Sequence, residues 1–146
     1  MAAEERYYEE VEVGGPLPSE TKGPVTTDLM VRWAAGSGDF NPIHYDKDWA
    51  LSQGLPGVVV AGPMKAAMLA HFAARWAGSL HRVKALQCRY RAMDLPGDVL
   101  TLGGKVIAKE VTDAGGQVVC EVWTKNQRGE VTTMGSVTLI LPRRGG

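Results

Sequence analysis

Residues 62–78, GPMKAAMLAHFAARWAG, have the composition of a helix that is mostly buried. A Gly-Pro pair favours a helix start, and Gly78 favours the helix end. Between these limits only Lys65, His71 and Arg75 are strongly polar. A helix with so little polar surface is buried on most of its sides, so other parts of the chain have to cover it.

The second half of the chain has the pattern of strands that can cover this helix. The segment after the helix alternates, with Leu86, Cys88 and Tyr90 on one face and polar side chains on the other. Turns rich in glycine or asparagine separate the three segments that follow, VLTLGGKVIAKEV, GGQVVCEVWTKNQRGE and VTTMGSVTLILP. We therefore predict an α+β fold in which an antiparallel sheet curls around the helix, with Gly103 and Gly104 as bend points. An open sheet edge favours dimerisation.

The first part of the chain predicts shorter elements. The segment VEVGGPLP has the pattern of a short strand and a turn, and an extended segment follows it. Thr26 or Thr27 can cap a helix over residues 28–35. Asp46 is a second N-cap candidate, for a short helix that stops at Gly54.

The bulk composition predicts one globular domain over residues 1–146. Sixteen basic side chains balance sixteen acidic ones, which gives no indication of a nucleic-acid partner. No apolar run approaches the ~20 residues of a membrane span, and the acidic N-terminus lacks the apolar core of a secretory signal. We expect a cytoplasmic protein without a membrane contact, with Cys88 and Cys120 as reduced, buried thiols.

The stretch GSGDFNPIHYD, residues 36–46, gathers groups that handle protons on an irregular segment. An Asn-Pro turn lies between Asp39 and His44 and can bring the carboxylate and the imidazole together. Such a pair suits general acid-base catalysis near neutral pH. The alternative is structural: Asp39 and Asn41 stabilise a turn and His44 is an ordinary polar residue. From spacing alone the two interpretations are about equally good.

Other candidate sites have weaker signals. His44, Asp46 and Asp48 have ligand atoms for a metal, but carboxylates beside a helix start are usually caps. His71 is expected to be a packed, hydrogen-bonded histidine. Ser37 lacks the strand-turn-helix setting of a serine nucleophile.

Gly62 is a candidate of a different kind, because its backbone rather than a side chain would act. Helix N-termini carry unpaired N–H groups, and such an amide can polarise a carbonyl as in an oxyanion hole. The simpler interpretation, which the sequence favours, is that Gly62 accommodates the turn into the helix.

The order of these parts resembles one family. The stretch WAAGSGDFNPIHYDKDWA closely resembles the signature of the MaoC-like, R-specific enoyl-CoA hydratases, Gly-Asp-x-Asn-Pro-Ile/Leu-His followed by a short acidic helix. The later RYRAMDLPGDVLTL resembles the strand-turn-strand of that family, and the resemblance covers residues 10–141. It implies the hot-dog fold, a long central helix wrapped by a curved antiparallel sheet.

The resemblance also implies roles for individual residues. Asp39 and His44 match the catalytic pair of the family, and Asn41 matches the asparagine that holds the loop. Gly62 matches the residue whose amide binds the thioester carbonyl. Many members have His-Gly at that point, whereas this chain has Ala61 before the glycine. The implied side-chain contacts near the acyl group therefore differ from those of such members.

The implied reaction is reversible addition of water to a trans-2-enoyl thioester, which gives an (R)-3-hydroxyacyl thioester. It requires no metal and no cofactor, because coenzyme A or an acyl carrier protein enters only as part of the substrate. The implied assembly is a homodimer, or a heteromer with a second hot-dog subunit without which the chain is inactive.

Two alternatives compete with this interpretation. A hot-dog acyl-CoA thioesterase usually has its carboxylate on or near the long helix, but residues 62–78 contain no Asp or Glu. A non-catalytic hot-dog subunit usually lacks the Asp/His pair, which is intact here. The basic side chains Lys65, Arg75, Arg89 and Arg91 are either contacts for a CoA phosphate or, as is more common, solvated or ion-paired.

Overall fold

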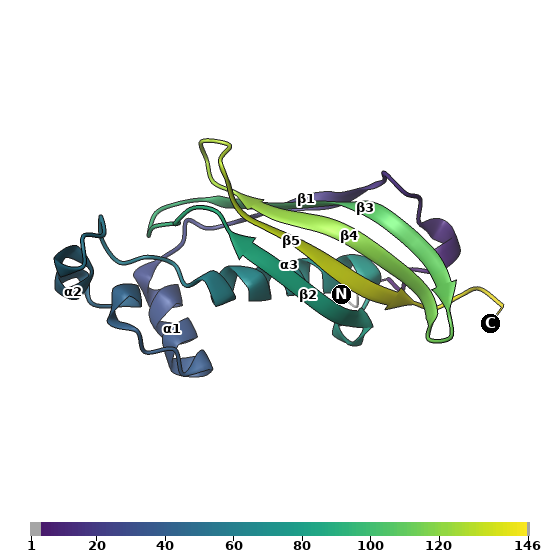
Figure 1. Ribbon diagram of the computed structural model, residues 1–146, viewed down its shortest axis with the longest axis horizontal. Helices are drawn as coiled ribbons and strands as arrows, with labels where there is room; N and C mark the ends of the chain where they lie inside the picture. Colours follow the sequence, from purple (N-terminus) through teal and green to yellow (C-terminus); the bar gives the residue numbers. More distant parts are fainter. Residues whose placement is uncertain (1–3, 146) are drawn as a thin grey trace.

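The computed structural model describes residues 4–145 and is drawn in Figure 1. Five antiparallel strands form one sheet in the order β1-β3-β4-β5-β2. The elements in chain order are η1 (Tyr8–Glu10), β1 (Pro16–Lys22), α1 (Thr27–Ser37), η2 (Pro42–His44), α2 (Lys47–Ser52), α3 (Gly62–Ala77), η3 (Leu80–Arg82), β2 (Val83–Tyr90), β3 (Leu100–Thr112), β4 (Gly115–Lys125) and β5 (Val131–Leu141).

Helix α3 lies under the curved sheet, and α1 and α2 extend beyond one end of it (Figure 1). Leu69, Phe72 and Ala73 of α3 are buried in one cluster with apolar side chains from all five strands. Burying a side chain the size of Leu69 or Phe72 stabilises the fold by about 1.5–3 kcal/mol relative to its exposure. The predicted α+β class, with a long helix wrapped by an antiparallel sheet, is confirmed.

The N-terminal strand differs from the prediction. The structure has no strand at VEV; β1 starts at Pro16 instead, and Val11 packs into the core from an irregular segment. Proline removes a ladder donor, so a segment with Pro16 and Pro18 is a poor candidate for a central strand. β1 tolerates both prolines because it lies at the sheet edge and pairs only with β3 among the described residues.

Helix boundaries follow the predicted caps. The Thr26 hydroxyl accepts a hydrogen bond from the Leu29 amide at 3.1 Å, and Asp46 accepts one from Trp49 at 3.0 Å. Gly78 ends α3 with a φ of 103°, a left-handed conformation that glycine adopts without strain.

One side of α3 remains open to solvent, which the composition did not predict. His71 is exposed and makes no hydrogen bond within the described residues, so the prediction that it is packed and hydrogen-bonded is wrong. Arg75 is also exposed and donates to Glu20 of β1. That hydrogen bond, opposed by partial burial, lowers the pKa of Glu20. Within residues 4–145 no helix is long and apolar enough to cross a membrane.

The two cysteines are free, but only one is fully buried. Burial raises the pKa of the Cys120 thiol to about 12. Cys88 is half-buried, because β2 forms the other edge of the sheet, and burial raises its pKa to a smaller extent. The prediction of two buried thiols therefore holds for Cys120 alone.

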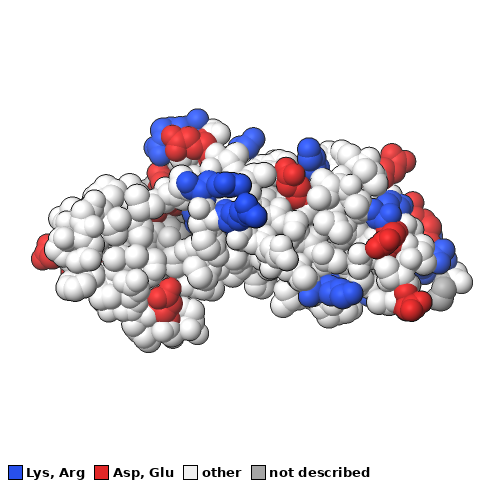
Figure 2. All heavy atoms as spheres, in the orientation of Figure 1, with Lys and Arg blue, Asp and Glu red and all other residues white. Residues whose placement is uncertain are grey.

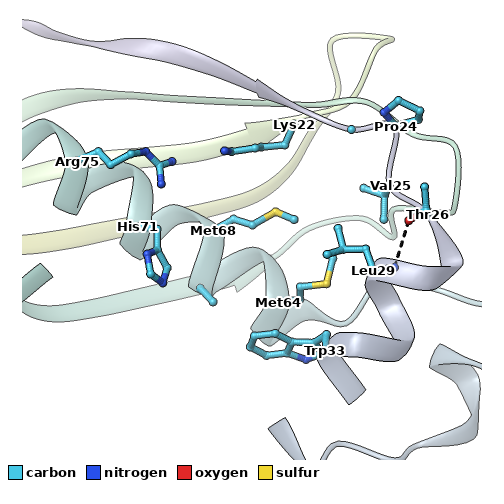
Figure 3. A pocket seen from close by; sticks show the side chains of 12 residues that line it. Lys22, Pro24, Val25, Thr26, Leu29, Trp33, Met64, Met68, His71 and Arg75 are labelled. Carbon is cyan, nitrogen blue, oxygen red and sulfur yellow. Dashed lines mark hydrogen bonds between the residues drawn. The ribbon is translucent and has the colours of Figure 1, made fainter. Parts of the chain in front are cut away.

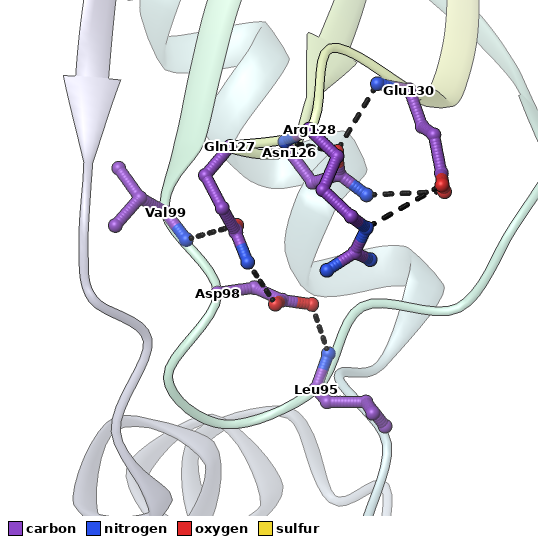
Figure 4. A network of polar contacts seen from close by, with 7 residues as sticks. All are labelled: Leu95, Asp98, Val99, Asn126, Gln127, Arg128 and Glu130. Carbon is purple, nitrogen blue, oxygen red and sulfur yellow. Dashed lines mark hydrogen bonds and ion pairs between the residues drawn. The ribbon is translucent and has the colours of Figure 1, made fainter.

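Residues 91–99 connect three parts of the chain. Val25, between β1 and α1, donates to the Asp98 carbonyl at 2.9 Å and accepts from Gly97 at 2.8 Å. The Asp98 carboxylate accepts from the Gln127 side chain and the Leu95 amide, both at 2.9 Å (Figure 4). Burial opposes ionisation of Asp98, but these two hydrogen bonds outweigh it and lower its pKa.

We predict that Asp98→Asn lowers the free energy of unfolding at pH 7 by about 1–3 kcal/mol, because a charged acceptor is lost. The lowered pKa stabilises the wild type above the ordinary value of 3.8, and this contribution is lost as the pH falls through the folded-state pKa. The difference between variant and wild type in urea unfolding should therefore shrink from pH 7 to pH 3. Asp113→Asn, at an exposed turn, is the control. A difference that grows toward low pH would contradict this account.

Candidate functional site

Asp39 and His44 lie together between α1 and α2. The distance from His44 Nε2 to Asp39 Oδ2 is 3.6 Å. The His44 side chain is 11% exposed and that of Asp39 is 34% exposed, so the pair lies at the border of the protein interior. The predicted chain reversal at the Asn-Pro turn therefore occurs, and it brings the carboxylate and the imidazole to one place.

The other imidazole nitrogen fixes the protonation pattern of His44. Its Nδ1 lies 2.7 Å from the Val59 carbonyl oxygen. A carbonyl only accepts hydrogen bonds, so Nδ1 carries the hydrogen and donates it. In the neutral ring Nε2 then has a free lone pair, and it is this atom that faces Asp39.

Short local hydrogen bonds shape the loop around the pair. The Asn41 amide donates to Asp39 Oδ1, and the Ile43 amide donates to Asn41 Oδ1, both at 3.3 Å. Asn41 is thereby the N-cap of η2, the turn that ends at His44. The structural roles considered for Asp39 and Asn41 thus exist beside the Asp39–His44 contact and do not exclude it.

Gly62 is the first residue of α3, and the ring of Tyr90 covers it. A Cβ atom at this position would lie 2.7 Å from Tyr90 Cε2, too close without movement of the ring. Helix geometry leaves the Gly62 amide without an acceptor inside the helix. Burial, together with the nearby Cys88, raises the pKa of the Tyr90 hydroxyl.

The segment between η2 and α3 links these parts. The Val59 amide donates to the Ile43 carbonyl at 2.9 Å, beside the bond from His44 to the Val59 carbonyl. Val59 lies three residues before Gly62 and is buried. His44 and the start of α3 are therefore held by one short, buried stretch of backbone. No sequence signal identifies Val59, because a backbone carbonyl has no residue-type preference.

Lys65 is not available to a CoA phosphate. Its Nζ lies 2.8 Å from Asp94 Oδ2, and both side chains are almost fully buried. Arg75 forms its ion pair with Glu20. A lysine in a mostly apolar helix is the sequence signal that indicates a buried ion pair. The sequence does not indicate which carboxylate is its partner.

A cleft of about 670 Å³ runs along the open side of α3 (Figure 3). Its walls are mostly apolar, with Leu29, Trp33, Met64 and Met68 among them, and Lys22, His71 and Arg75 add polar groups. None of Asp39, Asn41, His44 and Gly62 lines it. Met64 connects the two regions, because it packs in a buried cluster with Val58, Val60 and Ala61, which flank Val59 and Gly62.

The groups in this region suit proton transfer. A free imidazole nitrogen can take a proton from water, and a carboxylate beside it can stabilise the imidazolium that results. The Asp46 carboxylate caps α2, and residues 4–145 contain no cluster of three or more His, Cys, Asp and Glu side chains suited to a metal.

Comparison with known protein families shows to which family the chain belongs. The family described as MaoC like domain, a family of dehydratases, matches residues 9–128, most of the chain and all of the site. The protein belongs to the MaoC-like dehydratases. Membership of this family supports hydratase or dehydratase activity in general for this MaoC-like chain. The fold is the hot-dog fold.

Two relatives carry functional names. Fatty acid synthase subunit beta of Saccharomyces cerevisiae is 26% identical over 136 residues, which are 92% of this chain but only 6% of that protein. The 3-oxo-4,17-pregnadiene-20-carboxyl-CoA hydratase beta subunit of Mycobacterium tuberculosis is 28% identical over 121 residues, 83% of this chain and 90% of that protein. The chain therefore spans a small part of the first relative and nearly all of the second.

A solved structure supports the fold. The unliganded R-hydratase PhaJ1 from Pseudomonas aeruginosa superposes with a TM-score of 0.83 at 22% identity, covering 94% of this MaoC-like chain and 86% of that one. At this level of identity the likeness concerns the fold alone.

We predict that Gly62→Ala destabilises this MaoC-like chain by about 1–3 kcal/mol, because the new methyl group displaces the Tyr90 ring. In a Tyr90→Ala background the same substitution should be neutral or stabilising, because alanine favours a helix by ~1 kcal/mol over glycine. A double-mutant cycle from urea unfolding measures the coupling. Equal costs in both backgrounds would show that the ring does not restrict position 62.

Proposed function

We propose that this chain catalyses the reversible hydration of trans-2-enoyl thioesters to (R)-3-hydroxyacyl thioesters, with Asp39 and His44 as the catalytic pair. The observation that carries the proposal is the geometry of His44. Its Nδ1 is held by the Val59 carbonyl, and its free Nε2 lies 3.6 Å from Asp39 within a chain of the dehydratase family.

The proposed mechanism begins with one water molecule that contacts both members of the pair. A separation of 3.6 Å is longer than a direct hydrogen bond, so both groups can contact the same water. His44 Nε2 takes a proton from this water while its oxygen bonds to C3 of the enoyl group. Asp39 orients the water and stabilises the imidazolium. The proton on His44 then reaches C2, either directly or after transfer to Asp39, so that one water is added in total.

Electron density moves toward the thioester oxygen during the attack. The Gly62 amide, at the positive end of α3, is proposed to donate a hydrogen bond to this enolate-like oxygen. One such donor typically contributes ~3 kcal/mol to transition-state stabilisation. The reaction involves neither a change in oxidation state nor a metal-bound water, so we propose that no cofactor takes part. Coenzyme A or an acyl carrier protein is the carrier of the substrate.

We propose that the apolar cleft along α3 receives the acyl chain. Its walls are mostly apolar and include Met64, two residues from Gly62. A cleft of this size matches ordinary small-molecule sites.

The proposed assembly contains a second hot-dog subunit, either another copy or a different chain. Strand β2 pairs only with β5 within the described residues, so its other edge offers free backbone groups. Phe40, Tyr45 and Trp49 expose large apolar side chains around the site. Figure 2 shows few charged side chains on the visible face of the end of the molecule that contains α1 and α2. One named relative is itself a hydratase beta subunit.

We predict that the purified chain, or its complex, hydrates crotonyl-CoA or a longer trans-2-enoyl-CoA, followed as loss of enoyl-thioester absorbance. Asp39→Asn and His44→Ala should each reduce kcat by about 10²–10⁴, because acid-base catalysis typically contributes that much. Asp28→Asn and His81→Ala, both outside the site, are the matched controls. Normal turnover by a folded His44→Ala variant would refute the assigned roles. Release of free CoA without hydration would indicate a thioesterase instead.

We predict that Ala67→Leu, in the wall of the cleft, shortens the accepted acyl chain. The added carbons should lower kcat/KM for a ten-carbon enoyl-CoA by about tenfold or more and affect crotonyl-CoA little. An unchanged unfolding temperature would show that the leucine is tolerated. An unchanged kcat/KM for the ten-carbon substrate would place the acyl chain outside this cleft.

A further inference from the structure

The buried ion pair between Lys65 and Asp94 is unusual in this molecule. Lys65 is 1% exposed and Asp94 is fully buried. Lys65 Nζ donates to Asp94 Oδ2 at 2.8 Å and to the Ala92 carbonyl at 3.2 Å. Asp94 Oδ1 is also buried, and it has no hydrogen-bond partner among the described residues.

Such a pair is a weak source of stability. Removing both charges from water costs several kcal/mol per ion, and their attraction offsets this cost only in part. Apolar residues of similar volume often replace a buried pair without loss of stability. A fixed geometry is therefore a better explanation for the pair than additional stability.

The backbone of Asp94 connects the pair to the candidate site. The Asp94 carbonyl accepts a hydrogen bond from the Val60 amide at 2.9 Å. The preceding residue, Val59, binds the imidazole of His44 through its carbonyl. Asp94 therefore holds α3 with its side chain and the segment before α3 with its backbone.

The same loop also covers the start of the helix. The chain runs from Tyr90, whose ring lies on Gly62, through Ala92 to Asp94. Lys65 Nζ lies 5.8 Å from the centroid of the Tyr90 ring. The ammonium group thus makes two hydrogen bonds to the loop, at Ala92 and Asp94, and lies within cation–π distance of Tyr90 at the end of β2.

We infer that Lys65 and Asp94 are positioning residues, which hold residues 59–62 so that the Val59 carbonyl keeps His44 in its Nδ1–H form. The structural part of this inference is independent of the reaction, whereas its effect on turnover rests on the proposed function. Without the pair, the segment shifts relative to α3, and the imidazole is no longer held in one tautomer.

The test uses the double variant Lys65→Met/Asp94→Leu, which removes both charges and keeps nearly the same number of side-chain heavy atoms. The single variants leave a buried charge unpaired and can fail to fold. Thermal unfolding of the double variant verifies that it folds. The control is Arg82→Met/Glu5→Gln, which removes an ion pair beyond the opposite end of α3.

The first readout is the ¹⁵N chemical shifts of the His44 ring, which distinguish Nδ1–H from Nε2–H. The protein has three histidines, so His44→Gln assigns the signal. We expect Nδ1–H in the wild type and in the control, and a mixture of the two tautomers in the double variant. This readout requires no turnover and remains valid if the wild type hydrates no enoyl thioester.

The second readout is the kinetics of hydration. Loss of alignment should lower kcat by about tenfold or more and leave KM nearly unchanged, since misplacement of a catalytic group affects mainly the chemical step. A folded double variant with the wild-type tautomer and wild-type kcat would overturn the inference and leave the pair a purely structural role. A changed tautomer in the control would overturn it as well, because the effect would not be specific to this pair.

Discussion

Contact between the apolar face of α3 and the concave face of the sheet determines where the other elements lie (Figure 1). Burial of Leu69, Phe72 and Ala73 fixes the helix along the sheet, and with it the point at which α3 starts. The chain between β1 and this point does not join the sheet and extends past its end, where α1 and α2 lie. The irregular segment with Asp39 and His44 is attached to the core by the apolar packing of α1 and α2 and by hydrogen bonds to the backbone before α3.

Those contacts come from three separate parts of the sequence. Residues 38–46 contain Asp39 and His44, residues 59–62 bind the imidazole and begin α3, and residues 90–94 hold residues 59–62 from the other side. The carbonyl of Val59 specifies which nitrogen of His44 is free, so the tautomer of a side chain is set by main-chain geometry.

Features determined by local pattern could be predicted from the sequence. The bounds of α3, the caps at Thr26 and Asp46 and the four strands after α3 follow from periodicity and capping preferences, and the turn after Asp39 follows from Asn-Pro. Features determined by distant partners could not. Lys65 and Asp94 are 29 residues apart, and the exposure of His71 depends on which side of α3 remains uncovered. The strand at Pro16 was missed because edge strands tolerate prolines.

The close approach of Tyr90 to Gly62 restricts the order in which positions 62 and 90 can change during evolution. A side chain at position 62 clashes with the Tyr90 ring, whereas a smaller residue at position 90 clashes with nothing while position 62 is glycine. Accepted substitutions can therefore occur in one order only, with loss of the ring before gain of the methyl group. Among descendants of this chain, the residue at 90 determines which residues are permitted at 62, and the first substitution is hard to reverse once the second has occurred.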